Sequence, residues 1–263
     1  MTQTYALKGG DEARGRLERM SEIRAEYTRA LFARAGVFRG ARCVDLGCGT
    51  GHVTRLLADM VGPDGFVLGL DIDDRMIEVN SIDAPGNVEF RGGDIGQFDG
   101  SNFDVAYMGL VLMHFPDPRE IVDAAVRCLR PGGILITEDV DTTVAFCSPS
   151  SPAFDRMIGL YDSLLDGKAR RAPLASPELL RAAGLTDVGL SLYQNVTAAA
   201  AEKALLPLSL RHAAEAVVAF GLASAEELED LVAQLEALCE DPACIFAMPR
   251  FHQVWGRLQT PAA

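Results

Sequence analysis

The sequence predicts an α/β protein built around a doubly wound, mostly parallel β-sheet. Between residues 42 and 137, short apolar runs of the kind found in buried strands alternate with segments whose apolar residues recur at helical spacing. A glycine-rich turn at residues 47–51 joins the first such run to the first of these helical segments. Strands that alternate with helices in this way are typical of a parallel sheet with helices on both faces.

The first half of the chain contains most of the expected sheet. Residues 11–35 carry an amphipathic stripe and are expected to form a helix that precedes the sheet. A later helix is expected to begin after Asp117, because an aspartate N-cap followed by Pro118 is a typical helix start. Strands are expected at residues 42–46, 65–72, 87–91, 103–108 and 134–137, and the helices between them at 50–61, 73–80 and 118–129.

The second half is expected to be mostly helical. Helices are expected at residues 152–165, 176–183 and 198–240, and strands at 187–196 and 244–255. Ser224 and Glu227 form a capping-box pattern. We expect an N-terminal helical cap at 1–39, a core at 40–144, a helical acceptor and lid region at 145–243 that includes a sixth strand, and the last strand and tail at 244–263.

Composition excludes several function classes. The chain has 263 residues, with 24 Lys and Arg against 37 Asp and Glu and a formal net charge of -13, and no stretch gathers enough basic residues to bind a phosphate backbone. We therefore expect no nucleic acid partner. No apolar stretch approaches the roughly 20 residues of a membrane-spanning helix, and the first residues lack the apolar core of a secretion signal. A cytoplasmic protein without membrane insertion is expected.

The most informative segment is Asp45-Leu46-Gly47-Cys48-Gly49-Thr50-Gly51. Glycines allow a tight turn and the close approach of a ligand, and the following helix offers unpaired N–H groups to an anionic group. Nicotinamide and flavin folds use G-x-G-x-x-G for a pyrophosphate. Here the spacing is G-x-G-x-G, with His52 in place of the third glycine, and Asp45 would repel a pyrophosphate but suits a ligand that carries an ammonium group.

Two further acidic residues follow strands of the expected sheet. The second strand ends in Gly69-Leu70-Asp71, which places a carboxylate where it can accept hydrogen bonds from two ribose hydroxyls. The third strand is followed by Gly93-Asp94-Ile95, where the carboxylate can accept from an adenine amino group and the next backbone N–H can donate to the ring. Together with the glycine turn, these residues indicate a site for a nucleoside.

As a set, these residues resemble the class I S-adenosylmethionine-dependent methyltransferase family. The resemblance covers about residues 40–140 and includes Phe103-Asp104-Val105, Met113-His114-Phe115-Pro116-Asp117 and Leu129-Arg130-Pro131-Gly132-Gly133. It implies a Rossmann-like seven-stranded sheet whose last strand is antiparallel. Residues 5–10 and 253–256 are similar to a small-molecule branch related to quinone-ring and secondary-metabolite methyltransferases.

The resemblance implies the residues that hold the cofactor S-adenosyl-L-methionine. Its amino group would lie near Asp45, and its ribose would be held by Asp71. The methionine part would also be contacted by Gly47, Gly49 and Met108. The adenine would be contacted by Ile72, Met76, Asp94 and the Ile95 amide.

Methyl transfer from a sulfonium is an in-line displacement, so a dedicated base is optional. An acceptor that must lose a proton would benefit from a base near the carboxyl ends of the fourth and fifth strands. His114 is the first candidate, and Asp139 the second, from the group Glu138, Asp139 and Asp141. No metal is expected, because the six cysteines form no C-x-x-C pair and no acidic set matches the metal ligands of catechol methyltransferases.

These observations predict methylation of O, N or C of a small, apolar or aromatic metabolite of secondary metabolism, and they leave a homodimer open. One alternative keeps the cofactor but not the transfer, as a binding protein or a cyclase on the same fold. The other is a nicotinamide oxidoreductase, which would bind NAD.

Overall fold

The computed structural model describes residues 11–166 and 168–260. The motif at residues 5–10 lies outside the described residues. The chain divides into two compact units, each assembled from three segments. We call the unit of residues 24–139, 172–192 and 252–260 the sheet unit, and the unit of residues 11–23, 140–171 and 193–251 the helical unit.

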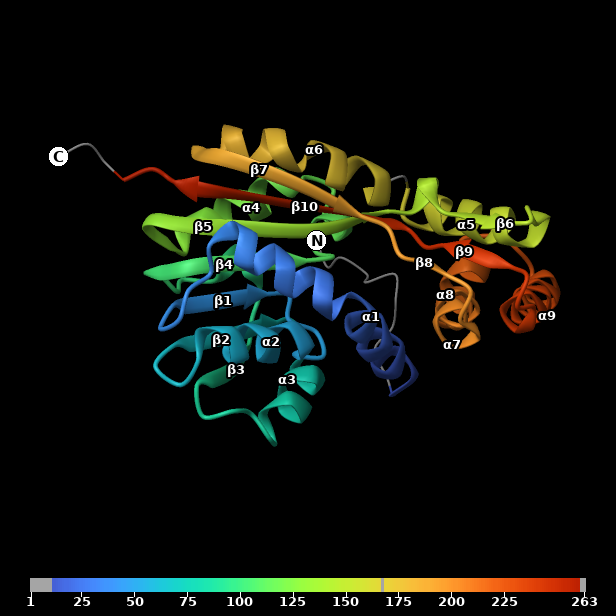
Figure 1. Cartoon of the computed structure of the whole chain (residues 1–263), viewed down its shortest axis with the longest axis horizontal. Coiled ribbons are helices and arrows are strands. Elements are labelled where there is room, and N and C mark those ends of the chain that lie inside the picture. Colours follow the sequence, from blue (N-terminus) through green and yellow to red (C-terminus); the bar gives the residue numbers. More distant parts are fainter. Residues whose placement is uncertain (1–10, 167, 261–263) are drawn as a thin grey trace. The chain divides into compact units, whose positions relative to one another are not determined.

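The sheet unit contains a seven-stranded sheet in the order β3-β2-β1-β4-β5-β10-β7 (Figure 1). Strands β1 to β5 pair in parallel, with Cys43 of β1 opposite Val67 of β2 and Val105 of β4. Parallel pairing places the carboxyl ends of all five strands at one edge of the sheet. The strands are β1 (Arg42–Leu46), β2 (Phe66–Asp71), β3 (Val88–Gly92), β4 (Phe103–Gly109), β5 (Leu129–Asp141), β7 (Leu185–Tyr193) and β10 (Arg250–Leu258).

The last strand, β10, runs antiparallel to β7. The Ser191 hydroxyl donates to Gln253 Oε1 at 2.8 Å, and the Thr186 hydroxyl donates to the Arg257 carbonyl at 3.3 Å, so the residue numbers rise along one strand as they fall along the other. Figure 1 shows the two arrows pointing in opposite directions. The predicted fold class, a mostly parallel seven-stranded sheet with an antiparallel last strand, is confirmed.

Helices α1 (Asp11–Ala35) and α2 (His52–Val61) supply the apolar cover of one sheet face. Leu31 and Phe32 of α1 and Leu57 of α2 are fully buried against side chains from β1, β2, β4 and β5. The Phe32 ring meets the Tyr107 ring of β4 edge to face at 5.1 Å. The other helices of this unit are α3 (Asp74–Ser81), α4 (Pro118–Arg127) and most of α6 (Lys168–Ala182).

Helix α4 begins as the sequence predicts, but two other boundaries were wrong. The Asp117 side chain accepts from the Arg119 amide, as an N-cap should. Strand β5 is far longer than residues 134–137, because a break in register between Phe103 and Val105 of β4 accommodates the Pro-Gly-Gly segment as an irregularity within the strand. Helix α6 begins eight residues earlier than predicted and contains Pro173 and Pro177, residues that disfavour a helix interior.

The two late strands predicted from sequence were also wrong, because each is split between two sheets. Residues 187–196 divide between β7 and β8 (Val196–Thr197), and residues 244–255 divide between β9 (Ile245–Ala247) and β10. Strands β8 and β9 join β6 (Phe146–Ser148) in a separate sheet of order β6-β9-β8. Its strands have two or three residues each, which is too short for a periodic pattern to reveal.

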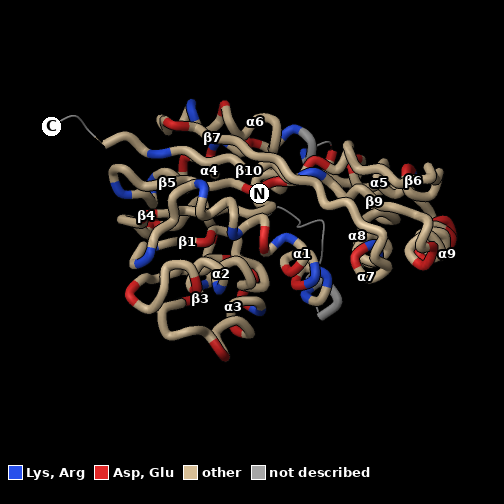
Figure 2. The backbone as a smooth tube through the Cα atoms, viewed as in Figure 1, with Lys and Arg blue, Asp and Glu red and all other residues tan. Residues whose placement is uncertain are grey.

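Charged residues of both signs are interspersed along the described chain. Figure 2 shows blue and red positions distributed along the chain, and α1 carries both. Mixed surfaces of this kind favour solubility and do not by themselves indicate a partner.

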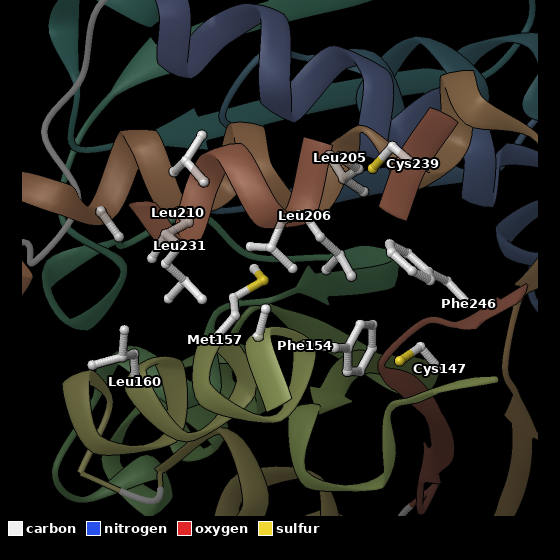
Figure 3. Packing of buried hydrophobic residues seen from close by; sticks show 14 of the residues in the cluster. Cys147, Phe154, Met157, Leu160, Leu205, Leu206, Leu210, Leu231, Cys239 and Phe246 are labelled. Carbon is white, nitrogen blue, oxygen red and sulfur yellow. The ribbon is translucent and has the colours of Figure 1, made fainter. Parts of the chain in front are cut away.

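The helical unit has its own apolar core (Figure 3). Phe154 of α5 (Pro152–Leu164) meets Phe246 of β9 edge to face at 5.0 Å. The core also receives side chains from α8 (Leu205–Ala219) and α9 (Ala225–Glu240). Ser224 caps α9 by accepting from the Glu227 amide at 3.1 Å, which confirms that half of the predicted capping box. The lid and the domain boundaries given above remain predictions.

A buried lysine holds the end of α9. Lys203 of α7 (Ala200–Lys203) is 0% exposed, and its ammonium group donates to the carbonyls of Leu238, Asp241 and Cys244 at 3.1, 2.7 and 3.0 Å. The last carbonyls of a helix have no partner inside the helix, so a buried cation satisfies them. Lys203 therefore has a structural role.

We predict that Lys203→Met lowers the free energy of unfolding by about 2–4 kcal/mol, because several buried carbonyls lose their donor. Urea denaturation checks this. Arg211→Met is the matched control, since Arg211 joins α8 to Glu236 of α9 through an exposed pair at 2.7 Å and should cost under about 1 kcal/mol. Equal losses for the two variants would contradict a structural role for the buried ammonium group.

Candidate functional site

The glycine turn after β1 adopts a backbone that favours glycine. Gly47, Gly49 and Gly51 have φ of 82°, 51° and 71°, all in the left-handed region. The turn is tied to the end of β2, because the Leu70 carbonyl accepts from the amides of Gly47 and Cys48 at 2.8 and 3.0 Å. The turn therefore has a defined position at the carboxyl edge of the sheet.

Two side chains hold the peptide groups of Gly49. Its amide donates to Asp71 Oδ2 at 2.7 Å, and its carbonyl accepts from Asn80 Nδ2 at 2.8 Å. The second Asp71 oxygen accepts from the Asp73 amide at 3.0 Å. Asn80 is fully buried at the end of α3, and the sequence analysis missed it because its partner is a backbone atom 31 residues away.

Open space lies beside Gly49 but not beside Gly47. A Cβ atom added to Gly49 would meet no atom within 4 Å, whereas one added to Gly47 would lie 2.7 Å from Val111 Cγ2. Gly47 is thus required for packing against the loop after β4. Gly49 faces a space in which a ligand can approach the backbone beside Asp71.

The predicted adenine contacts line the same edge of the sheet. Ile72 directly follows β2 and is 67% exposed, an unusual position for an isoleucine. Met76 lies in the first turn of α3 and is half-buried. Asp94 is exposed and caps a short 3-10 helix by accepting from the Gly96 amide at 2.8 Å, while Ile95 is buried. All four follow β2 or β3, in the order that the sequence predicts.

Asp45 and Met108 lie deeper than the other predicted contacts. Both are almost fully buried, and Asp45 accepts from the Thr54 hydroxyl of α2 at 2.7 Å. Burial raises the pKa of Asp45 to about 7, and the nearby Asp71 adds to the rise. A cation close to the turn would lower this pKa, so Asp45 is suited to respond to an ammonium group.

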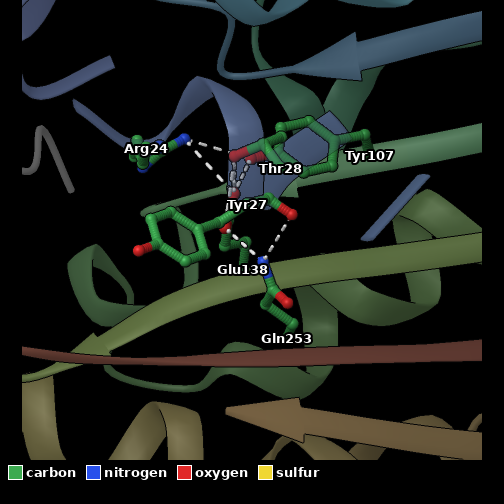
Figure 4. Close-up of polar contacts among 6 residues, drawn as sticks. All are labelled: Arg24, Tyr27, Thr28, Tyr107, Glu138 and Gln253. Carbon is green, nitrogen blue, oxygen red and sulfur yellow. Dashed lines mark hydrogen bonds and ion pairs between the residues drawn. The ribbon is translucent and has the colours of Figure 1, made fainter. Parts of the chain in front are cut away.

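Glu138 is the centre of a buried hydrogen-bond network (Figure 4). Its carboxylate is 0% exposed and accepts from Thr28 of α1, Tyr107 of β4 and Gln253 of β10, at 3.0, 2.8 and 2.9 Å for the shortest contact of each. Arg24 of α1 lies 3.5 Å from Glu138 Oε2. The sequence predicts that one carboxylate of Glu138, Asp139 and Asp141 faces the acceptor, with Asp139 preferred, and the structure gives Glu138 a structural role.

Asp139 lies beside Glu138 in sequence but has different surroundings. It is 1% exposed, and neither carboxylate oxygen has a hydrogen-bond partner among the described residues. Burial raises its pKa to about 7, with the Glu138 charge adding to the rise, while the nearby amides of Leu112 and Met113 act against it. Asp139 is therefore a buried carboxyl group that changes protonation near neutral pH.

His114 lies in the loop to which those two amides belong. Leu112–His114 forms a short 3-10 helix after β4, and His114 is half-buried at its end. Leu110, just before it, has a φ of 60°, a strained value for leucine that the sequence analysis did not anticipate. The structure therefore brings together the neighbourhoods of the two predicted candidate bases, Asp139 and His114, at the ends of β5 and β4.

The remaining candidates have other surroundings. Asp141 is buried and caps the turn that follows β5, where it accepts from the amide and the hydroxyl of Thr143 at 2.9 and 2.6 Å. His252 is buried in β10, and His212 lies in α8. Among the described residues no group of His, Cys, Asp and Glu is arranged to hold a metal ion. Nor does any described helix have the length and apolar character of a membrane span.

We predict that Glu138→Ala lowers the free energy of unfolding by about 3–5 kcal/mol, because it leaves the buried Arg24 charge without its carboxylate. Glu138→Gln should cost less, since an amide oxygen still accepts from its neighbours. The measurement is chemical denaturation, with the exposed pair of Arg156 and Glu227 as the control. A loss for Glu138→Ala no larger than that for Glu227→Ala would show that the network is not what holds α1 to the sheet.

We also predict that stability falls as the pH rises from about 4 to about 7. Asp45 and Asp139 have pKa values near 7 when folded against an ordinary 3.8, so across this range the folded chain binds more protons than the unfolded chain. Asp45→Asn and Asp139→Asn should each flatten this dependence in thermal unfolding measured between pH 4 and pH 8. Asp83→Asn, at an exposed position, is the control, and curves that all run parallel to that of the unsubstituted chain would contradict the assignment.

Residues 38–158 match the family model described as a methyltransferase domain. The demethylmenaquinone methyltransferase of Staphylococcus aureus strain JH9 is 32% identical over 130 residues, which are 48% of this chain and 52% of that protein. The chain thus spans about half the length of the curated relatives it matches.

Solved structures share the fold at low sequence identity. A SAM-dependent methyltransferase from Aquifex aeolicus has a TM-score of 0.54 at 15% identity, over 95% of this chain and 100% of that one. The [4+2]-cyclase SpnF has a TM-score of 0.50 at 18% identity, over 90% and 81% of the two chains. Residues 38–158 are thus similar to methyltransferase domains, and the seven-stranded sheet has the fold of solved methyltransferases.

Proposed function

We propose that the chain uses S-adenosyl-L-methionine to methylate O, N or C of a small apolar or aromatic molecule. The observation that carries this proposal is the open space beside Gly49, next to the Asp71 carboxylate at the carboxyl edge of the sheet. The demethylmenaquinone methyltransferase that the chain resembles is named for a quinone substrate, which supports an aromatic ring as acceptor. A cytoplasmic location, a homodimer and a lid remain part of the proposal.

The residues of the turn fit the donor molecule. When bound, the donor supplies an electrophilic methyl group on a positively charged sulfur. Asp71 uses one lone pair of each oxygen on the amides of Gly49 and Asp73, so lone pairs remain for ribose hydroxyls. Exposed Ile72 provides an apolar surface for the adenine, and Asp45 provides a negative charge for the amino group.

Asp139 and His114 are the proposed proton acceptors. A base works best when its pKa lies near the working pH, and the pKa of Asp139, raised to about 7 by burial, meets this condition. The absence of hydrogen-bond partners for its oxygens among the described residues leaves it able to accept a proton. An acceptor that needs no deprotonation would not require either residue.

We predict that Asp71→Ala weakens binding of S-adenosylhomocysteine by about 1–3 kcal/mol, the usual effect of losing hydrogen bonds to a charged group. Isothermal titration calorimetry measures this, and Asp83→Ala serves as the control because Asp83 is exposed on the α3 side of the sheet unit. Unchanged affinity in a folded Asp71→Ala variant would place the ligand elsewhere.

A turnover assay then separates the proposed function from its alternative. Incubation with methyl-labelled donor and quinone-like phenols should yield labelled product and S-adenosylhomocysteine. The alternative, a cyclase or a binding protein, is favoured by the shared fold with the [4+2]-cyclase. Tight donor binding without any S-adenosylhomocysteine over a broad acceptor panel would support that alternative.

A further inference from the structure

The hydrogen bond between Glu138 and Gln253 shows how β5 and β10, which are neighbours in the sheet, lie against each other. Gln253 Nε2 donates to Glu138 Oε1 at 2.9 Å, and both side chains lie on the face of the sheet that α1 covers (Figure 4). Farther along the two strands, Ile134 Cδ1 and Arg257 Nη2 lie 3.9 and 3.7 Å from the position of a Cβ atom built on Gly36, just after α1. The two strands are therefore antiparallel, with residue numbers that rise along β5 as they fall along β10.

This pairing places Asp139 and His252 next to each other on the opposite face. Successive residues of a strand point to opposite faces. Asp139 follows Glu138 in β5, so its side chain turns away from α1. His252 precedes Gln253 in β10, so its side chain turns away from α1 as well. Residues that lie directly opposite each other in antiparallel strands have Cβ atoms about 4.5–5.5 Å apart.

The Asp139 carboxyl group is buried and lacks hydrogen bonds. Asp139 is 1% exposed and His252 is 8% exposed. Neither oxygen of Asp139 accepts a hydrogen bond from a described residue. Burial raises the pKa of Asp139 to about 7, the Glu138 charge adds to the rise, and Arg24 acts against it. A polar group in such surroundings is costly unless a neighbour forms a hydrogen bond with it or exchanges a proton with it.

An imidazole can do both. Histidine binds and releases a proton between about pH 5 and pH 8, which includes the range in which Asp139 changes protonation. An imidazolium beside a carboxylate favours the charged form of each group. A carboxyl group and an imidazole that lie side by side therefore titrate as a coupled pair.

We propose that Asp139 and His252 form a pair that shares a proton and relays it away from the methyl acceptor. The O–H or N–H bond of the acceptor breaks, its electron pair stays on the atom that receives the methyl group, and the proton binds an Asp139 oxygen. His252 then takes up this proton and restores the carboxylate. His252 acts through Asp139 and is a positioning residue. The relay rests on the proposed methyl transfer, whereas the pair does not.

Titration of the histidines by NMR tests the pair without any substrate. The chain has four histidines, so replacing each in turn by glutamine assigns every imidazole signal. Asp139→Asn should lower the titration midpoint of His252 by about one pH unit, because the imidazolium loses its negative neighbour. Asp123→Asn, the same change at an exposed position of α4, should leave this midpoint unchanged. An unchanged His252 midpoint in a folded Asp139→Asn variant would overturn the pair.

The reciprocal titration covers the case in which Asp139→Asn does not fold. In a chain labelled with ¹³C at the aspartate carboxyl groups, His252→Gln should raise the titration midpoint of Asp139. The shift should equal that of the first experiment, since the coupling between two binding sites is reciprocal. His212→Gln is the control, because His212 lies in α8 of the helical unit. An Asp139 midpoint that is the same in both variants would overturn the pair.

The pH dependence of methyl transfer tests the relay. In His252→Gln, the limb on which kcat/KM rises should move to higher pH by about one unit, and kcat should fall with little change in the KM of the acceptor. His212→Gln should keep the profile of the unsubstituted chain. A profile unchanged by His252→Gln would overturn the relay. If no acceptor yields S-adenosylhomocysteine, the proposed function fails, and the two NMR titrations still decide whether the pair exists.

Discussion

The burial of the Glu138 carboxylate is the constraint on which the sheet unit depends. A buried carboxylate is tolerated only when charge and hydrogen bonds compensate it, and Glu138 draws its partners from α1, β4 and β10. Because these elements are far apart in sequence, the requirement to surround one side chain holds the first helix and the last strand against the middle of the sheet. Figure 4 shows the partners converging from different elements.

The alternation of side chains along β5 explains why Glu138 and Asp139 differ. Successive residues of a strand point to opposite faces, so satisfying Glu138 on the α1 face directs Asp139 to the other face. There it approaches the amides of the loop after β4 without forming hydrogen bonds to them. The same strand thus carries Glu138, which holds several elements together, and Asp139, whose pKa is raised to about 7.

The sequence predicted what local patterns encode. Periodicity predicted the succession of the first five strands and the helices between them, Asp117-Pro118 predicted the start of α4, and the glycine spacing located the turn. These features depend on neighbouring residues. The Pro-Gly-Gly segment within β5, the prolines within α6 and the short strands of the second sheet were missed, since tertiary pairing there overrides local preference. The contacts of Asn80 with Gly49 and of Gln253 with Glu138 were missed for a related reason, because the partners are 31 and 115 residues away in the sequence.

The presence or absence of hydrogen-bond partners separates buried polar groups that hold the fold from those that are candidates for a function. Glu138 and Lys203 are buried, and their charged groups form hydrogen bonds to other residues of the chain. Both groups therefore stabilise the fold. Asp139 is comparably buried, yet the described residues do not satisfy its carboxylate oxygens. The two carboxylates are neighbours in β5, so the partners available on each face of the strand, and not burial alone, decide which of them holds the fold.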